Sequence, residues 1–239
     1  MISKNRIRFI NALSQKKQRI ENNRFIIEGE KMVHEAIQWI PAQIENIYAT
    51  SDFESNTLID SILLEEISTK ELKEISTLTT PNKALAVCKI LENKSVDSPL
   101  IICLDGVQDP GNMGTILRLA DWFGIKDVVC SKNTVDCYNP KVLQATMGAI
   151  FRVNVHYLDL TEFLSTTELP VFGALLDGEN IFENNYERNG IIVLGNEGNG
   201  ISKEIKKYVQ KAITIPRFGE AESLNVATAG AIILGAFYR

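Results

Sequence analysis

The sequence predicts an α/β protein whose larger part is built on a mostly parallel sheet with helices on both faces. From residue 100 onward, short apolar runs bounded by Gly or Pro alternate with segments that have helical spacing. Several of these runs are apolar at every position, which is typical of strands in a sheet that is covered on both faces. The chain has 239 residues, of which 45% are hydrophobic and 23% charged, so it is long enough for two ordinary soluble domains.

A polar segment at 91–99, closed by a proline, has the composition of a linker. We therefore expect one domain at 1–94 and a second, larger domain at 95–239. In the first domain, helical spacing predicts a helix at 30–39, and Ser or Thr ahead of acidic residues predicts another helix start near 67–71. Its β-rich runs predict strands at 24–28, 44–49 and 84–90. The first domain is therefore expected to be a small α/β domain.

The second domain is expected to alternate strands with helices. Its apolar runs predict strands at 100–104, 127–130, 151–155, 171–175, 191–194 and 212–215. The segments between them predict helices at 115–123, 140–148, 202–210 and 223–237. This alternation is typical of parallel strands joined by helical crossovers.

The charge of the chain is unevenly distributed. The formal net charge is -5, yet seven basic residues and one acidic residue lie between Met1 and Arg24. Such a segment is either a solvated amphipathic helix or an arm that contacts the phosphates of a nucleic acid. The pattern by itself leaves both interpretations open.

The four cysteines do not have the spacing of a zinc site, because none forms a C-x-x-C pair. No apolar run approaches the ~20 residues that a membrane span requires. The N-terminus is basic but lacks the apolar core of a signal peptide. We therefore expect a cytoplasmic protein with buried thiols, no metal and no membrane association.

Two glycine-rich loops follow predicted strands near the end of the chain. One runs from Gly195 to Gly200 and contains Glu197, and the other begins at Ile215 and is followed by the segment 223–226. Because ligands bind at the carboxyl ends of strands in open α/β sheets, these loops predict a small-molecule pocket. The first loop matches neither the dinucleotide fingerprint nor a P-loop, which argues against a nucleoside triphosphate. Glu197 either caps the following helix or holds a ligand group or an arginine.

A third loop, 105–114, follows the first strand of the second domain. Asn112 lies where the next helix is expected to start, so its first interpretation is an N-cap, worth about 1 kcal/mol. Arg118 lies on the side of that helix away from Ile116 and Ala120, which suits a solvated residue as well as a functional one. Because both histidines lie outside the three loops, the usual hydrolytic mechanisms are disfavoured, and transfer from an activated donor fits better.

Three motifs stand in order at the ends of predicted strands. They are Asp109-Pro110-x-Asn112-x-Gly114-x-x-x-Arg118, then Leu194-Gly195-Asn196-Glu197-Gly198-x-Gly200, then Ile215-Pro216 with Ser223-Leu224-Asn225-Val226. Over roughly 99–239 the chain resembles the SpoU (TrmH-like) RNA ribose 2′-O-methyltransferases of the SPOUT class. The segments 25–31 and 80–87 are similar to the opening and close of the family's accessory domain, which resembles ribosomal protein L30e and is taken to bind RNA.

The resemblance implies an α/β-knot, in which the C-terminal segment passes through a loop to form a trefoil knot. It implies S-adenosylmethionine as the methyl donor and places the cofactor-binding positions at Gly195, Ile215 and Leu224. It also implies a homodimer whose active site is completed near the dimer interface. The catalytic roles that it assigns fall on Asn112, Arg118, Glu197, Ser223 and Asn225.

The implied substrate is RNA, either 23S rRNA or tRNA. Because tRNA members of the family commonly lack the accessory domain, rRNA is favoured. Two alternatives stay open: a non-catalytic RNA-binding or ribosome-assembly protein that keeps the fold, and a base methyltransferase of the same knotted class. Arg217, where the family commonly has Met, is either a phosphate contact or a salt-bridged surface residue.

A ribose 2′-hydroxyl needs help in losing its proton, whereas the methyl group of a sulfonium is already electrophilic. A guanidinium has a pKa above about 12 and resists acting as a base. We therefore expect Arg118 to clamp the neighbouring phosphate and align the hydroxyl, while the phosphate or a water accepts the proton. A threaded chain also predicts small residues where backbone crosses backbone, which we expect at Gly198, Gly200 and Gly219.

Overall fold

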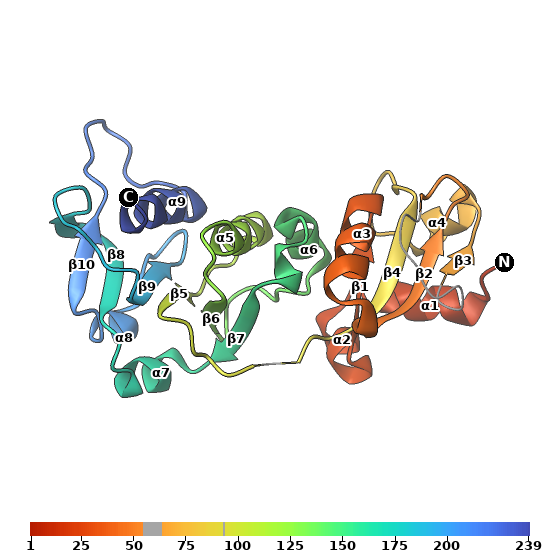
Figure 1. Ribbon diagram of the computed structural model, residues 1–239, viewed down its shortest axis with the longest axis horizontal. Coiled ribbons are helices and arrows are strands. Elements are labelled where there is room, and N and C mark those ends of the chain that lie inside the picture. The colour runs from red at the N-terminus through yellow and green to blue at the C-terminus, as the bar shows by residue number, and fades with distance from the viewer. Residues whose placement is uncertain (55–63, 93) are drawn as a thin grey trace. The chain divides into compact units, whose positions relative to one another are not determined.

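The computed structural model describes residues 1–54, 64–92 and 94–239. Contacts divide the chain, shown in Figure 1, into two compact units. The first unit contains Met1–Glu92 and Tyr138–Phe151, and the second contains Asn93–Cys137 and Arg152–Arg239. In the predicted linker, Asn93 lies outside the described residues, and the others between 91 and 99 form no helix or strand.

The first unit has a four-stranded sheet in the order β1-β4-β2-β3. Strand β4 pairs antiparallel with β1 and β2, and β3 pairs parallel with β2. The strands are β1 (Arg24–Glu28), β2 (Ile44–Ala49), β3 (Leu64–Glu66) and β4 (Ala84–Lys89). The three predicted strands are confirmed, whereas β3 was missed because its three residues are exposed and carry no apolar run.

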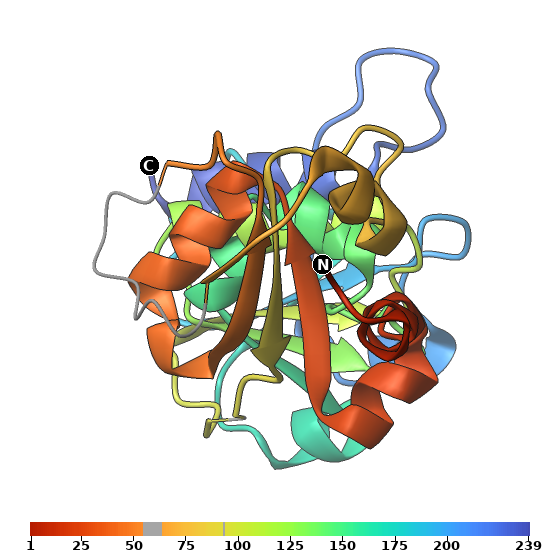
Figure 2. The same cartoon turned by 90° about the vertical axis from the view of Figure 1, so that its right-hand side faces the viewer.

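Helices cover both faces of this sheet (Figure 1 and Figure 2). Helix α3 (Glu30–Trp39) packs on one face, and α1 (Lys4–Ala12) and α4 (Thr69–Ile75) lie over the other. The start of α4 is the predicted one, because Ser68 and Glu71 form a capping box. The unit is completed by α2 (Lys16–Asn22), α6 (Pro140–Thr146) and the short 3-10 turns η1 (Pro41–Gln43) and η2 (Ala149–Phe151).

The basic N-terminal segment forms α1, α2 and the first residue of β1, and several of its arginines bond within the first unit. Arg6 donates to the hydroxyl of Tyr48 (2.6 Å), and Arg24 pairs with Glu45. Arg19 is buried and donates to main-chain carbonyls at 2.7 and 2.9 Å. These three arginines therefore hold the unit together. The basic side chains that remain exposed are Lys4, Arg8, Lys16 and Lys17.

The second unit has a six-stranded sheet in the order β10-β8-β9-β5-β6-β7, and all its neighbouring strands pair in parallel. Helices α5 (Pro110–Trp122) and α9 (Val226–Phe237) lie together on one face, and α7 (Leu160–Thr166) and α8 (Lys203–Lys206) lie on the other (Figure 1). The predicted parallel sheet with helices on both faces is thus confirmed. Its strands are β5 (Leu100–Asp105), β6 (Asp127–Ser131), β7 (Asn154–Leu158), β8 (Val171–Asn180), β9 (Gly190–Gly195) and β10 (Lys211–Thr214).

Two helices begin several residues away from their predicted starts. Helix α5 starts five residues earlier, because Asp109 is its N-cap and Pro110 occupies the first helical position, where a missing N–H costs nothing. Asn112 therefore lies in the first turn of α5, and its prediction as an N-cap is wrong. Helix α9 begins at Val226 rather than at residue 223, because Asn225 is its N-cap.

Three further elements differ in extent. Strand β7 lies three residues later than predicted, because η2 occupies Ala149–Phe151. Helix α8 has only four residues, and the chain turns before β10 begins at Lys211. Strand β8 continues to Asn180 because its second half pairs with β10 after a shift in register.

Both histidines lie away from the three candidate loops, as predicted. His156 is buried in β7, and its Nε2 lies 2.8 Å from Oδ1 of Asp127. Burial raises the pKa of Asp127, but hydrogen bonds from Ser98, His156 and Asn154 outweigh it and hold the pKa below its usual value. This network joins the starts of β6 and β7 to the segment before β5. In the described parts of the chain, no helix is long and apolar enough to cross a membrane.

Candidate active site

The chain order of the second sheet reverses between its central strands β5 and β9. Strands β6 and β7 follow on one side of β5, whereas β8 and β10 lie beyond β9 on the other side. Ligands bind at such a switch point, outside the carboxyl ends of the strands. Asp105 and Gly195 end the two strands as paired residues. Two of the three candidate loops therefore start side by side.

Gly195 allows the loop after β9 to fold back on its own strand. A Cβ at this position would lie 2.1 Å from the carbonyl carbon of Gly200 and 2.2 Å from the nitrogen of Ile201. Backbone hydrogen bonds in both directions between Asn196 and Gly200, at 3.0 and 2.9 Å, close the loop. Any side chain at Gly195 would push these two backbone segments apart.

The predicted set of crossing glycines is wrong. A Cβ at Gly200 or Gly219 would meet nothing within 4 Å, and one at Gly198 would make only an ordinary contact. Close backbone approaches lie instead at Gly195, at Gly178 and at Gly190. A Cβ would be 2.7 Å from the backbone of β10 at Gly178 and 2.7 Å from the carbonyl oxygen of Pro170 at Gly190. Glycine in a loop also serves turn conformations, as the φ of +66° at Gly200 illustrates. The trefoil knot itself stays a prediction.

A cavity of about 670 Å³ opens beside the Gly195–Gly200 loop. This volume is within the range of small-molecule sites, about 300–1,000 Å³. Ile215 and Leu224 line the cavity together with Gly195, so the structure brings together the three positions predicted to bind the cofactor. The charged side chains among the lining residues are Asp177, Glu197, Glu222, Lys206 and Arg217.

Glu197 ties the loop after β9 to the loop after β5. Its Oε1 accepts hydrogen bonds from the N–H of Asp109 (3.1 Å) and from Nδ2 of Asn112 (3.0 Å). Its Oε2 accepts from the N–H of Gln108 (3.2 Å). Glu197 does not cap α8, because Ser202 does so. Of the interpretations open for Glu197, capping the following helix is therefore wrong.

Asn112 extends this connection to the third motif. Its Oδ1 accepts a hydrogen bond of 2.8 Å from Nδ2 of Asn225. Oδ1 of Asn225 in turn accepts from the first N–H groups of α9, at 3.0 and 3.2 Å. Glu197, Asn112 and Asn225 therefore form one hydrogen-bonded series across all three motifs, which we call the carboxylate–amide chain.

Glu197 is expected to stabilise the second unit less as the pH falls. Burial raises the pKa of this carboxyl, but hydrogen bonds from Asn112 and from backbone N–H groups outweigh it and hold the pKa below its ordinary value of about 4.5. Because the folded pKa is the lower one, the stabilisation is complete above the unfolded pKa and is lost as the pH falls below about 4.5.

The measurement is thermal unfolding of the wild type and of Glu197→Gln between pH 7 and pH 3.5. The variant places an amide where four donors point, so we expect a lower melting temperature at pH 7. The difference from the wild type should shrink in acid. A difference that stays constant over this range would contradict the assignment.

Arg118 and Ser223 stand apart from the carboxylate–amide chain. Arg118 lies on the exposed side of α5, as predicted, and does not line the cavity. Within the described part of the chain, its guanidinium has no hydrogen bond or ion pair. Ser223 lines the cavity from an exposed position. A single chain therefore does not bring the predicted catalytic residues to one point.

Asn196, which was not among the predicted site residues, shapes the loop after β9. Its Nδ2 donates to the carbonyl of Gly106 (2.8 Å), and its Oδ1 accepts from the N–H groups of Gly198 (3.0 Å) and Asn199 (3.1 Å). Asn followed by glycine-rich residues is a turn signal, because its side chain bonds its own backbone two residues on. That signal was present in the second motif. No group of three metal-ligating side chains occurs among the residues that the structure describes.

Comparisons with known proteins identify the family. Residues 99–235 match the model of the SpoU rRNA Methylase family. The chain belongs to this family. Residues 4–86 match the MRM3-like substrate binding domain, so the predicted resemblance is confirmed for both parts of the chain. RlmP of Bacillus subtilis, named 23S rRNA (guanosine(2553)-2′-O)-methyltransferase, is 32% identical over 227 residues, which are 93% of this chain and 91% of RlmP.

Solved structures of SpoU relatives have the same fold. A TrmH-family protein from Porphyromonas gingivalis matches with a TM-score of 0.90 and 38% identity over 99% of this chain and 98% of that chain. An rRNA methyltransferase from Sinorhizobium meliloti, solved with S-adenosylmethionine bound, matches with a TM-score of 0.86 and 24% identity, over 99% of this chain and 95% of that one. The second likeness concerns the fold alone. The predicted α/β class with an additional N-terminal domain is confirmed.

Proposed function

We propose that this SpoU-family protein transfers a methyl group from S-adenosylmethionine to a ribose 2′-hydroxyl of 23S rRNA. The observation that carries the proposal is the carboxylate–amide chain, which joins all three motifs beside a cavity of about 670 Å³. The names of two relatives support rRNA as the substrate. These are RlmP of Bacillus subtilis and RlmB of Neisseria meningitidis, the latter named 23S rRNA (guanosine-2′-O-)-methyltransferase and 32% identical over 152 residues. The alternative substrate is tRNA.

The cavity suits the proposed donor. S-adenosylmethionine carries its methyl group on a cationic sulfonium, which makes that group electrophilic. Three carboxylates and two cations are among the residues that line the cavity, a balance that favours a cationic ligand. Ile213 and Ile215 provide apolar wall for an adenine ring, and the glycines leave backbone groups accessible. We assign donor binding to Gly195, Ile215 and Leu224.

Arg118 is the residue to which we assign substrate alignment. Its planar fork binds a phosphate bidentately and so fixes the adjacent ribose. The 2′-oxygen then forms its bond to the methyl carbon as the carbon–sulfur bond breaks, and the hydroxyl proton passes to a phosphate oxygen or a water. Asn112, Glu197 and Asn225 hold the loops in place. Ser223 orients the donor or the guanidinium.

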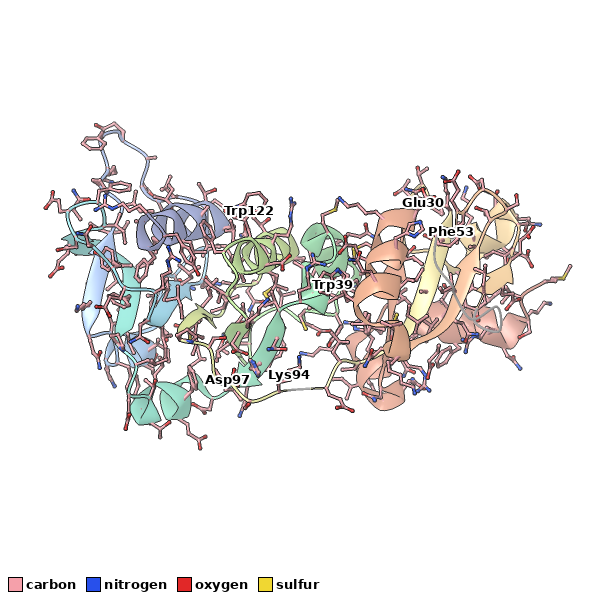
Figure 3. The ribbon with its side chains drawn as sticks, viewed as in Figure 1. Glu30, Trp39, Phe53, Lys94, Asp97 and Trp122 are labelled. Atoms are coloured by element: carbon pink, nitrogen blue, oxygen red, sulfur yellow. The ribbon has the colours of Figure 1, made fainter. Side chains whose placement is uncertain are left out.

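A homodimer completes the site in this proposal. The outward side of α9 is uncharged, with Thr228, Ala231, Ile232 and Gly235 at least partly exposed. The neighbouring α5 ends in Trp122, which is 84% exposed (Figure 3). An uncharged helix side next to an exposed tryptophan is typical of a subunit interface. Because Arg118 also lies on α5 outside the cavity, a second subunit would bring the guanidinium to the cavity of its partner.

The first unit supplies RNA affinity in this proposal. We keep the domain boundaries at 1–94 and 95–239, although contacts group Tyr138–Phe151 with the first unit. Lys4, Arg8, Lys16 and Lys17 are the exposed basic residues available for sequence-independent phosphate contacts. The target nucleotide would be recognised through RNA shape and unstacked bases. The four buried cysteine thiols fit a reducing cytoplasm, where we place the protein.

Calorimetry with S-adenosylmethionine tests the proposal against the non-catalytic alternative. We expect saturable binding in the micromolar range, because the cavity is preformed and lined by all three predicted donor positions. Leu224→Arg, a substitution at an exposed cavity position, should abolish the binding without unfolding the protein. No binding by the wild type at millimolar donor would favour an RNA-binding or ribosome-assembly role.

A further inference from the structure

An exposed aromatic side chain stands at the mouth of the cavity. Phe218 is 97% exposed and lies in the loop between β10 and α9, which Figure 1 shows projecting from the second unit. Leu176 (75% exposed) and Leu224 (49% exposed) line the same cavity as Phe218. A single exposed apolar residue is ordinary, but three around one cavity form a patch. We call these three residues the apolar rim.

Arg217 precedes Phe218 and also lines the cavity. One of its guanidinium nitrogens donates to the carbonyl of Ala221 at 3.3 Å, and the guanidinium has no acidic partner among the described residues. Arg217 is therefore not a salt-bridged surface residue, which was one of its two predicted roles. Glu220 and Glu222 are exposed in the same loop, so the net electrostatic attraction of this loop for RNA is small.

We infer that Phe218 stacks on an unpaired base of the RNA substrate next to the nucleotide that is methylated, with Arg217 contacting the adjoining phosphate. The inference rests on the proposed function and adds a recognition element to the same site. An aromatic ring with both faces in solvent can accept any base, and each stacked base contributes about 1–3 kcal/mol to binding. Because Glu220 and Glu222 offset the charge of Arg217, we attribute the RNA affinity of this loop to stacking rather than to electrostatic attraction.

The position of Phe218 favours RNA over the other possible occupants. The loop of Phe218 lies between the Ile215-Pro216 and Ser223–Asn225 motif segments, both of which contribute to the lining of the cavity. We therefore expect the ring to lie next to the target ribose. The donor fits among the buried and half-buried residues deeper in the cavity, such as Leu194, Ile213 and Ile215. A second copy of the chain is expected to pack on the uncharged side of α9 rather than on this loop. An RNA base flanking the target is therefore the remaining partner for the exposed ring of Phe218.

The test compares Phe218→Ala and Phe218→Trp, with Phe182→Ala as a matched control. Phe182 is also an exposed phenylalanine of the second unit, but it does not line the cavity. The readouts are binding of a 23S rRNA transcript by fluorescence anisotropy without donor, donor affinity by calorimetry, and KM and kcat for methyl transfer. We expect Phe218→Ala to weaken RNA binding and raise the RNA KM by about 5- to 100-fold. Donor affinity should stay within about twofold, and Phe218→Trp should restore RNA binding.

Three results would overturn the inference. They are unchanged RNA binding by Phe218→Ala, a loss of donor affinity that accounts for the whole effect, and dissociation of the dimer in sedimentation. Arg217→Met should lower the salt dependence of RNA binding by about one phosphate contact. Failure of the proposed function would be visible separately, as absence of donor binding and transfer in the wild type. RNA binding by the Phe218 variants can be measured in either case.

Discussion

Replacing Arg118 with lysine is expected to reduce kcat for methyl transfer by at least about 100-fold while S-adenosylmethionine still binds. Lysine keeps the charge but loses the planar fork, and a misplacement of about 1 Å can cost that much in rate. Donor binding should survive because Arg118 does not line the cavity. The measurement is single-turnover transfer of labelled methyl, with Arg8→Lys on α1 as the control for an exposed arginine. Near-normal turnover by Arg118→Lys would refute the clamp.

Mixed dimers decide whether Arg118 acts on the cavity of its own subunit or of its partner. Arg118→Lys and Leu224→Arg are each expected to be inactive alone, the first without the clamp and the second without the donor. If Arg118 acts across the interface, a mixed dimer places both defects in one site and leaves the other intact. Random exchange should then restore about a quarter of wild-type activity. No recovery, in a mixture shown to exchange subunits, would place Arg118 in its own subunit's site.

Among single glycine-to-alanine substitutions in the loop after β9, Gly195→Ala is expected to destabilise the fold most. The new Cβ would meet backbone atoms of Gly200 and Ile201 at 2.1 and 2.2 Å, and backbone cannot rotate away as a side chain can. We expect the free energy of unfolding to fall by about 3 kcal/mol. This corresponds to a melting temperature lower by roughly 6–12 °C. Donor binding should be lost because the cavity wall shifts.

Gly219→Ala is the matched control, since a Cβ there would meet nothing within 4 Å. Both glycines line the cavity, so the comparison separates backbone crowding from position. The control should stay within about 0.5 kcal/mol of the wild type. Equal stability and donor affinity for Gly195→Ala and the wild type would contradict the close backbone approach. A collapse of Gly219→Ala would instead restore the original prediction for that glycine.

Apart from β3, the strands of both sheets could be predicted from the sequence because their apolar runs are local and are mostly bounded by Gly or Pro. The segments 24–28, 100–104 and 191–194 fall within β1, β5 and β9. The start of α5 could not be predicted correctly, because Pro and Gly signal a loop as readily as a first helical turn. Pro110 proved to be the first residue of the helix.

The hydrogen bonds of the site lie beyond what local patterns reveal. The bond between Asn112 and Asn225 joins residues 113 positions apart, and the bond between Asn112 and Glu197 spans 85. The motifs identified these residues as a set, but only the three-dimensional contacts show that they form one series. In the same way, the composition of the N-terminal segment predicts a basic surface. It does not reveal that Arg6, Arg19 and Arg24 bond within the first unit.

The most direct test of the proposed activity is a map of ribose 2′-O-methylation in RNA from cells with and without this gene. We expect one methylated ribose in 23S rRNA to disappear with the gene. It should return with the wild-type protein but not with Arg118→Lys. Identical methylation maps in the two strains, with the protein expressed and bound to RNA, would contradict the enzyme assignment.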